Sequence, residues 1–272
     1  MSVATAPALA ATIVRPRGVG SFFSDTLLLT RRNLLLTFRT PELLVLSAIM
    51  PIMFVLLFRY VFGGSIHVPG YDSYIDYLIP GVVVQTALFG GSSSAVGVCE
   101  DLSKGVTDRL RSLPTNRASI LAARTLADLM RLGYTMALLI AVGLLVGFRV
   151  DNSAGPALAA IGIAMLFGYA CSWLFTLAGL LVRNVESATL AGFLLTFPLV
   201  FAASTFTSTQ FMPGWLRTFA DAQPVTQVAN ALRDLTHGHG FAGGHAAMAA
   251  VAWSLGILVV AATLAAWRFR RI

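Results

Sequence analysis

The polar side chains best suited to chemistry cluster in residues 100–114, and this segment contains the only lysine of the chain, Lys104. A P-loop that hydrolyses ATP requires the pattern G-x-x-x-x-G-K-[ST], in which the lysine contacts the β- and γ-phosphates. Lys104 follows Ser103 and precedes Gly105, so this pattern is absent. The sequence therefore predicts no ATPase site, and any ATP-driven work would need a nucleotide-binding partner.

The same segment carries charges of both signs, unlike a purely basic membrane anchor. Its charged and turn-forming residues are Glu100, Asp101, Lys104, Gly105, Asp108, Arg109, Arg111 and Pro114. Four apolar residues follow one another at spacings of 4, 4 and 3, namely Leu102, Val106, Leu110 and Leu113. This pattern predicts a short helix with one apolar stripe that ends at Pro114. Such a helix could dock into a groove of another protein or pack on the ends of its own membrane helices.

A second set of polar side chains lies inside an otherwise apolar run: Gln85, Ser92, Ser93 and Ser94. These groups could line a path for a substrate. Together with Gly90 and Gly91 they could equally form a face on which helices pack closely. The presence of Gln85 slightly favours the path.

Two further patterns in the sequence predict no functional site. The histidines of His237-Gly238-His239 have a spacing that metal sites use, but glycines surround them and carboxylates do not. We expect a loose extracellular loop there and no metal site. Ionisable residues such as Asp128 and Arg131 are expected only near the ends of the apolar runs, which speaks against a proton relay inside the membrane.

The elements that must position these residues follow from an unusually apolar composition. Of 272 residues, 57% are hydrophobic and 11% are charged, the mean hydropathy is +0.78 and the net charge is +7. Soluble domains are about 45–50% apolar and about 25% charged. So few charges cannot cover a water-facing surface, which excludes a soluble enzyme and a nucleic-acid-binding protein. The high apolar fraction excludes a disordered chain.

Six apolar runs are each long enough to cross about 30 Å of hydrocarbon, where backbone amides must be paired within a helix. The sequence therefore predicts an all-α membrane protein with six transmembrane helices. The runs cover about residues 43–62, 75–98, 129–148, 157–182, 189–206 and 246–267. Residues 1–20 are expected to form a flexible cytoplasmic tail, and residues 21–272 a single transmembrane domain.

The distribution of basic residues predicts the orientation of these helices. If the N-terminus is cytoplasmic, 15 of the 19 basic residues lie on the cytoplasmic side of the membrane. Six spans then place both termini in the cytoplasm. We expect a multi-pass protein of the plasma membrane.

A separate helix is predicted over residues 21–40, before the first span. Apolar residues recur there at helical spacing among arginines: Phe23, Leu27, Leu34 and Phe38 with Arg31, Arg32 and Arg39. Such a segment can lie at the membrane surface with its arginines near anionic lipid headgroups. Ser24 is the expected N-cap, and Pro41 marks the end of the helix. The alternative is a cytoplasmic extension of the first span.

Several short motifs together give the chain a family resemblance. They are Pro41-Glu42-Leu43, Met50-Pro51, Leu56-Leu57-Phe58, Phe62-Gly63-Gly64, Leu78-Ile79-Pro80-Gly81, Lys104-Gly105-Val106, Asp108-Arg109, Leu113-Pro114, Gly147-Phe148-Arg149, Met212-Pro213-Gly214-Trp215-Leu216, Pro224-Val225-Thr226, and Arg233, His237 and Gly238. In these motifs the chain resembles the ABC-2 type transport permeases, and within them the daunorubicin-resistance exporters. The resemblance extends from about residue 25 over nearly the whole chain.

The resemblance implies an export permease rather than an enzyme. A separate ABC ATP-binding subunit would hold ATP and magnesium, and this chain would bind no cofactor. The loop after the second span resembles a coupling helix that sits in a cleft of that ATPase, which assigns the contact to residues 100–114. Between spans five and six, the resemblance implies short extracellular helices that dip back into the membrane. The residues assigned to this re-entrant segment are Pro213, Gly214, Trp215, Pro224 and Thr226.

The resemblance also implies partners and a substrate class. Two six-span subunits, identical or related, are expected to form one pathway in contact with membrane lipid, with no role for nucleic acid. The expected substrate is a hydrophobic or amphipathic compound, drug-like or lipid-like, exported from a bacterial cell. The alternatives are a permease that exports lipid-linked glycans and a proton-coupled secondary transporter.

Overall fold

The computed structural model of the chain describes residues 19–66, 68–71, 73–106, 117–238 and 245–271. Within these residues every regular element is helical, as the apolar runs predict, and there is no strand. The longer helices are α1 (Val19–Phe38), α2 (Pro41–Leu57), α3 (Tyr74–Ser103), α5 (Arg117–Val146), α6 (Ala154–Leu181), α7 (Val185–Phe201) and α10 (His245–Arg271). The shorter elements are the π-helical turn η1 (Phe58–Phe62), the 3-10 turn η2 (Thr209–Phe211), α8 (Gly214–Ala222) and α9 (Pro224–His237).

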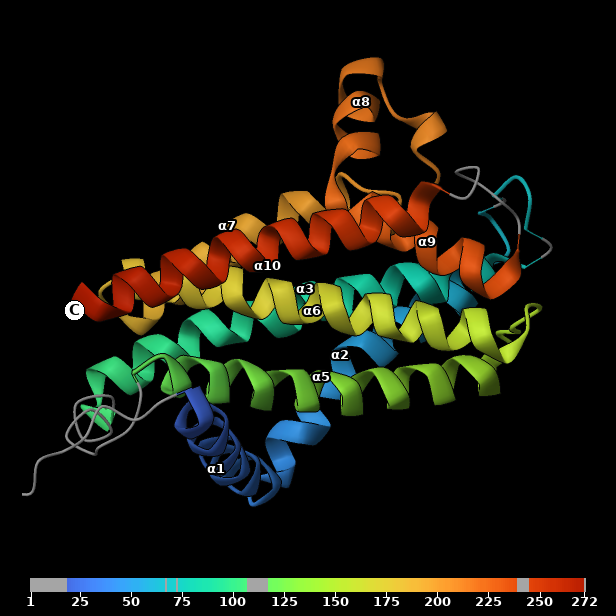
Figure 1. The fold of residues 1–272 in the computed structure, drawn as a ribbon. Helices are drawn as coiled ribbons and strands as arrows, with labels where there is room; N and C mark the ends of the chain where they lie inside the picture. Colours follow the sequence, from blue (N-terminus) through green and yellow to red (C-terminus); the bar gives the residue numbers. More distant parts are fainter. Residues whose placement is uncertain (1–18, 67, 72, 107–116, 239–244, 272) are drawn as a thin grey trace, which may run out of the picture.

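Five helical segments of the described chain are long and apolar enough to cross a membrane: α2 continued by η1, α3, α5, α6 and α10. In Figure 1, α3, α5, α6 and α10 extend along one common direction. The remaining predicted span corresponds to α7, whose 17 residues give a length of about 26 Å. This length falls somewhat short of the roughly 30 Å of hydrocarbon in a typical bilayer.

The start of α5 differs from the prediction. The helix begins at Arg117, well before the predicted start of the third span near residue 129. Asp128 and Arg131 therefore lie in the middle of a 30-residue helix, and the prediction that such residues occur only near helix ends is wrong for them. A hydropathy profile marks where an apolar run begins. The helix itself can begin earlier, because its backbone hydrogen bonds continue through charged residues whose side chains have partners.

Helix α3 forms the centre of the bundle. Two thirds (67%) of its most apolar window is buried, against 17% of the corresponding windows of α2 and α10. Helix α6 packs on α3 so closely that a Cβ added at Gly91 would lie 2.9 Å from the Cβ of Cys171. Glycine at this position therefore permits the approach of the two backbones.

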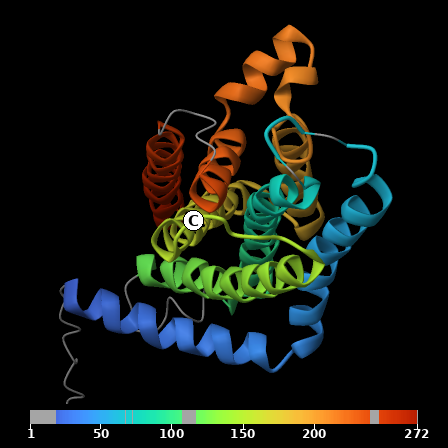
Figure 2. The ribbon, with the colours of Figure 1, turned by 90° about the vertical axis from the view of Figure 1, so that its right-hand side faces the viewer.

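Helix α1 crosses the long helices instead of running along them, since Figure 1 shows it nearly end-on and Figure 2 shows its full length. It precedes Pro41, as predicted, but it begins at Val19, so Ser24 lies within the helix and is not its N-cap. Thr30 is buried and its hydroxyl donates to the carbonyl of Ala123 on α5, at 3.4 Å. The exposed residues include Phe23, Leu27, Leu28, Arg31, Arg32, Leu35, Leu36 and Arg39. The side chain of Phe38 lies outside the described part of the chain.

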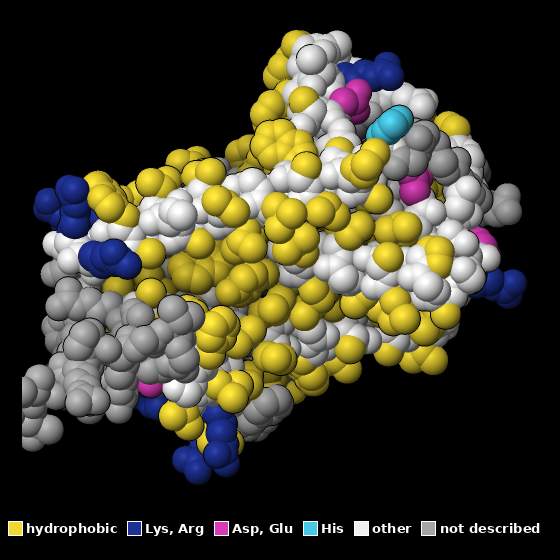
Figure 3. Space-filling model, in the orientation of Figure 1, with side chains coloured by type: hydrophobic (Ala, Val, Ile, Leu, Met, Phe, Trp, Pro, Cys, Tyr) yellow, Lys and Arg dark blue, Asp and Glu magenta, His cyan; other side chains and the backbone are white. Residues whose placement is uncertain are grey.

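Charged side chains lie mainly at the two ends of the molecule on the face shown in Figure 3, with an apolar belt between them. One end, here called the C-terminal end, brings together α1, the last turn of α3, the first turns of α5 and the end of α10 (Figure 1). The opposite end carries α9, and α8 projects sideways from the bundle near it.

Candidate functional site

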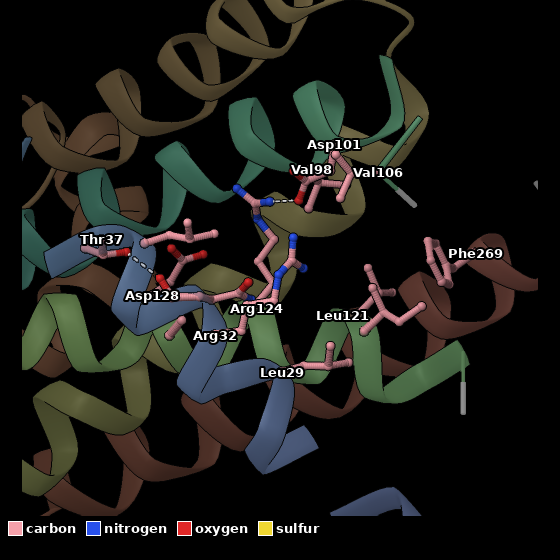
Figure 4. Close-up of a pocket in the computed structure, with 14 residues that line it drawn as sticks. Leu29, Arg32, Thr37, Val98, Asp101, Val106, Leu121, Arg124, Asp128 and Phe269 are labelled. Carbon is pink, nitrogen blue, oxygen red and sulfur yellow. Dashed lines mark hydrogen bonds and ion pairs between the residues drawn. The ribbon is translucent and has the colours of Figure 1, made fainter. Parts of the chain in front are cut away.

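A pocket opens at the C-terminal end between α1, α3, α5 and α10 (Figure 4). This end pocket has a volume of about 300 Å³. Its charged lining residues are Arg32, Asp101, Arg124 and Asp128. Asp101 and Val106 both line it and both belong to the predicted docking segment, so the described part of that segment borders the pocket.

An ion pair joins two helices at the end pocket. Nη1 of Arg124 on α5 donates to Oδ2 of Asp101 on α3, as Figure 4 shows. Glu100 and Lys104 form a second pair at 3.0 Å, but both of these side chains are exposed, so their pair contributes little to stability. The Asp101–Arg124 pair, whose side chains are 41% and 25% exposed, joins the end of α3 to α5.

The chain turns sharply directly after this ion pair. Helix α3 ends at Ser103, and Gly105 adopts a φ of +64°, which glycine tolerates best. The turn separates Leu102, which is on α3, from Val106, so the prediction of one helical stripe through both is wrong. The remaining residues of the docking segment lie outside the described part of the chain: Asp108, Arg109, Leu110, Arg111, Leu113 and Pro114.

A second pocket, here called the lateral pocket, lies between α2, α3, α5 and α7 and has a volume of about 390 Å³. Five phenylalanines supply much of its wall: Phe54, Phe89, Phe193, Phe197 and Phe201. On α7, the ring centroids of Phe193 and Phe197 lie 5.5 Å apart and those of Phe197 and Phe201 lie 4.4 Å apart. These three rings are also exposed on the surface, so the pocket opens toward the side of the bundle.

The predicted path residues divide between this pocket and helix packing. Gln85 and Ser93 line the lateral pocket. The hydroxyl of Ser92 instead donates to the carbonyl of Phe89 at 2.7 Å, and Ser92 faces Gly192 of α7. The hydroxyl of Ser94 donates to Oδ2 of Asp128 at 2.6 Å.

The lateral pocket contains an ion pair that the sequence did not single out. Oδ1 of Asp128 and Nη2 of Arg131 lie 3.3 Å apart, and Arg131 also donates to Ser93. The side chains are 15% and 28% exposed, respectively. Asp128 also lines the end pocket, so the two pockets share this residue. The i, i+3 spacing of the pair was a usable signal, but the predicted span, which starts near residue 129, placed both residues at the end of the membrane helix.

Near the opposite end, Arg233 on α9 is only 1% exposed. Its Nε donates to the carbonyl of Tyr77 at 3.1 Å, and its Nη2 donates to the carbonyl of Ser204 at 2.6 Å. Its Cζ also lies 3.5 Å from the centroid of the Tyr77 ring. Arg233 thus ties α9 and the segment after α7 to α3. The sequence signal for its burial is a four-residue repeat on one helix face: Val225, Ala229, Arg233 and His237.

His237 is buried, with 2% of its side chain exposed, so the expectation of a loose loop is wrong for this residue. It is the last residue of α9, and its Nε2 lies 3.7 Å from Oδ1 of Asp76. The rings of Tyr71 and Phe148 pack edge-on against it. Burial raises the pKa of Tyr71 well above its ordinary value, which keeps its phenol neutral. His239 lies outside the described residues.

The residues assigned to the re-entrant segment lie at the starts of short helices. Pro213 precedes α8, which begins at Gly214, and Pro224 is the first residue of α9. Trp215 is 77% exposed on α8. Thr226 is buried, and its hydroxyl oxygen accepts a hydrogen bond from the backbone amide of Ser204 at 3.1 Å.

Comparisons with known proteins agree on one class of membrane protein. The sequence profile of the ABC-2 type transporter family matches residues 24–236. The chain is 32% identical over 198 residues to the daunorubicin resistance ABC transporter permease protein DrrB1 of Streptomyces coeruleorubidus, covering 73% of this chain and 70% of the relative. It is 29% identical over 259 residues to a probable doxorubicin resistance ABC transporter permease protein, DrrC, of Mycobacterium tuberculosis, covering 92% and 90%.

Proposed function

This chain belongs to the ABC-2 type transporter family, and from that premise we propose that it is the membrane permease subunit of an ATP-driven exporter. The family match over residues 24–236 carries this conclusion. The two relatives named above are drug-resistance permeases, and both are aligned over more than two thirds of their length. The bundle of long apolar helices is the structure that such a subunit requires.

In this proposal the chain crosses the membrane six times, with α7 as the fifth span. A span slightly shorter than the hydrocarbon is accommodated by local thinning of the bilayer at modest cost. The C-terminal end carries Arg268, Arg270 and Arg271, and the exposed arginines of α1 lie near the same end, which supports a cytoplasmic location for it. Helix α1 would then lie along the headgroups of the inner leaflet of a bacterial plasma membrane.

The re-entrant segment between α7 and α10 is proposed to lie at the outer surface. Trp215 and Phe219 on α8 are exposed aromatic residues, which are common where a protein meets the membrane interface. Arg233 anchors the segment to α3 and would hold it in place while the spans move.

The partner ATPase is proposed to dock at the end pocket and at residues 100–114. It would supply the ATP and magnesium, since this chain contains no P-loop. A push on the loop after Ser103 would reach both α3 and α5, because the Asp101–Arg124 pair joins them there. Two permease subunits, identical or related, would complete the pathway.

The proposed substrate is a hydrophobic or amphipathic compound that leaves the inner leaflet. The lateral pocket supports this choice, since its aromatic wall opens sideways from the bundle. Lipid-linked glycan export remains the alternative within the family. Comparing ATP-dependent efflux of a cationic aromatic dye with that of a lipid-linked sugar separates the two, and intact glycan export without dye efflux would overturn the preference for drug-like compounds.

The coupling contact is tested by replacing Glu100 and Asp101 with alanine together. We expect less co-purification with the ATPase and a loss of substrate-stimulated ATP hydrolysis. The matched control is Asp151→Ala, which removes an exposed carboxylate between α5 and α6. If both measurements are unchanged in the double variant, the contact lies elsewhere.

A proton-coupled transporter is the second candidate, and the position of Asp128 inside a long apolar helix favours it more than the sequence did. Transport by the two mechanisms depends on different energy sources, ATP or the proton gradient. An ATP-driven exporter transports substrate when the proton gradient is collapsed and ATP is kept. Transport that stops under these conditions and persists without ATP would replace the proposed mechanism.

A further inference from the structure

The carboxylate of Asp128 has unused capacity to bind a cation. Its Oδ2 accepts a hydrogen bond from Ser94 at 2.6 Å, and its Oδ1 accepts a longer one from Nη2 of Arg131 at 3.3 Å. Hydrogen bonds between charged nitrogen and oxygen atoms are typically about 2.7–2.9 Å long, and a carboxylate has about four lone-pair positions. Arg131 also donates to Ser93, so it keeps a partner if a closer donor arrives at Asp128.

The wall of the lateral pocket offers aromatic rings to a bound cation. The faces of aromatic rings carry partial negative charge, and a cation over them is attracted. The five phenylalanines of this wall come from α2, α3 and α7 and surround the same space.

Gln85 supplies an additional polar contact in the same pocket. Its side chain is buried, with 4% of the residue exposed, and its Oε1 has no hydrogen-bond partner within the described chain. A buried amide oxygen without a donor is costly, so a ligand that carries an N–H or O–H group would relieve this cost. A pocket of about 390 Å³ is also within the range that binds small organic molecules.

We infer from these features that Asp128 is the specificity-determining residue of a substrate site in the lateral pocket, which takes amphipathic molecules with a cationic amine. The amine pairs with Oδ1 of Asp128, the apolar body lies against the phenylalanines, and a donor group meets Gln85. Asp128 also borders the end pocket, so a cation can meet this carboxylate from that side as well. The inference rests on the exporter function proposed above and deepens it.

The test measures binding to the full chain alone, without the ATPase, in nanodiscs of phosphatidylcholine. The two probes are rhodamine 123 and fluorescein, which share a xanthene ring system and differ in charge. Fluorescence anisotropy gives the two dissociation constants after subtraction of empty nanodiscs. We expect rhodamine 123 to bind at least about tenfold more tightly than fluorescein, because hydrogen bonds to charged groups contribute that much.

Substitutions at Asp128 identify the residue responsible. Asp128→Asn should remove the preference for rhodamine 123, whereas Asp128→Glu should keep most of it. Asp151→Asn removes an exposed carboxylate far from the pocket and should leave both constants unchanged. The inference is overturned if the wild type binds the two dyes equally tightly, or if Asp128→Asn keeps the full preference for rhodamine 123. The comparison of the two dyes in the wild type tests the inference even if Asp128→Asn does not fold.

The exporter function is judged separately, by ATP-dependent transport of an uncharged amphiphile in vesicles that contain the ATPase. Transport without any cation preference in the binding assay refutes only the role of Asp128. A cation preference that Asp128→Asn abolishes supports that role, whether or not transport depends on ATP.

Discussion

At the scale of single residues, Arg233 has the largest fully buried side chain of the described chain. The energetic cost of burying its charge is offset by carbonyl and hydroxyl acceptors from Tyr77 and Ser204 and by the ring of Tyr77. These acceptors match the planar guanidinium, which presents donors in several directions at once. A lysine ammonium at the same place could not reach all of them.

We therefore predict that Arg233→Lys destabilises the protein nearly as much as Arg233→Met. Losing several charge-assisted hydrogen bonds should lower the Tm in detergent by roughly 5 °C or more. Arg217→Lys on α8 is the control, because that arginine is exposed and should tolerate the change. A Tm for Arg233→Lys within a degree of the wild-type value would show that the guanidinium geometry does not matter.

At the scale of elements, α3 connects the functional regions of the molecule. Its last turn carries Asp101 at the end pocket, its middle lines the lateral pocket with Gln85 and Ser93, and its first turn meets Arg233 through Tyr77. A 30-residue helix is about 45 Å long and stiff over that distance. The positions of all three regions therefore depend on the close packing of α3 on α6.

Packing at Gly91 gives a prediction for this element. Gly91→Ala places a methyl group 2.9 Å from the Cβ of Cys171 and should destabilise the bundle by about 1–3 kcal/mol. The matched control is Gly162→Ala on α6, where an added Cβ meets no atom within 4 Å. Unfolding measured by thermal melting in the same detergent compares the two. Equal melting temperatures for the two variants would contradict the close approach of α3 and α6.

At the scale of the whole molecule, the orientation proposed above would account for the net charge of +7. The basic residues of α1 and of the end of α10 lie at one end, and the apolar belt separates them from the end that carries α9 (Figure 3). Positive charge on the short segments beside membrane helices marks the cytoplasmic side.

This arrangement predicts which positions a reagent outside the cell can reach. Cys99 and Cys171 are buried and are first replaced by serine. A membrane-impermeant maleimide added to intact cells should label Asp221→Cys on α8 and should leave Ser103→Cys unlabelled. Inverted vesicles should give the opposite result, and labelling of Ser103→Cys from outside the cell would reverse the proposed orientation.

The sequence alone was enough to predict a helical membrane protein without a P-loop, because hydropathy over about 20 residues and a short motif are local properties of the chain. It also placed a separate helix before Pro41 and a polar segment after the second predicted span, where α3 ends. The same local reasoning was wrong about the start of α5 and about Ser24 as an N-cap. Neither error was visible in hydropathy, because helix ends depend on which backbone and side-chain partners are available.

The tertiary structure alone decided which polar residues meet inside the bundle. Asp128 contacts Ser94 across 34 positions of sequence, and Arg233 contacts Ser204 across 29. A buried charge is stable only where its partners surround it, and those partners are assembled by the packing of α3, α5 and α9 rather than by neighbours in the chain. For this reason the contact of Asp128 with Ser94 and the anchor at Arg233 became recognisable only once the helices were placed together.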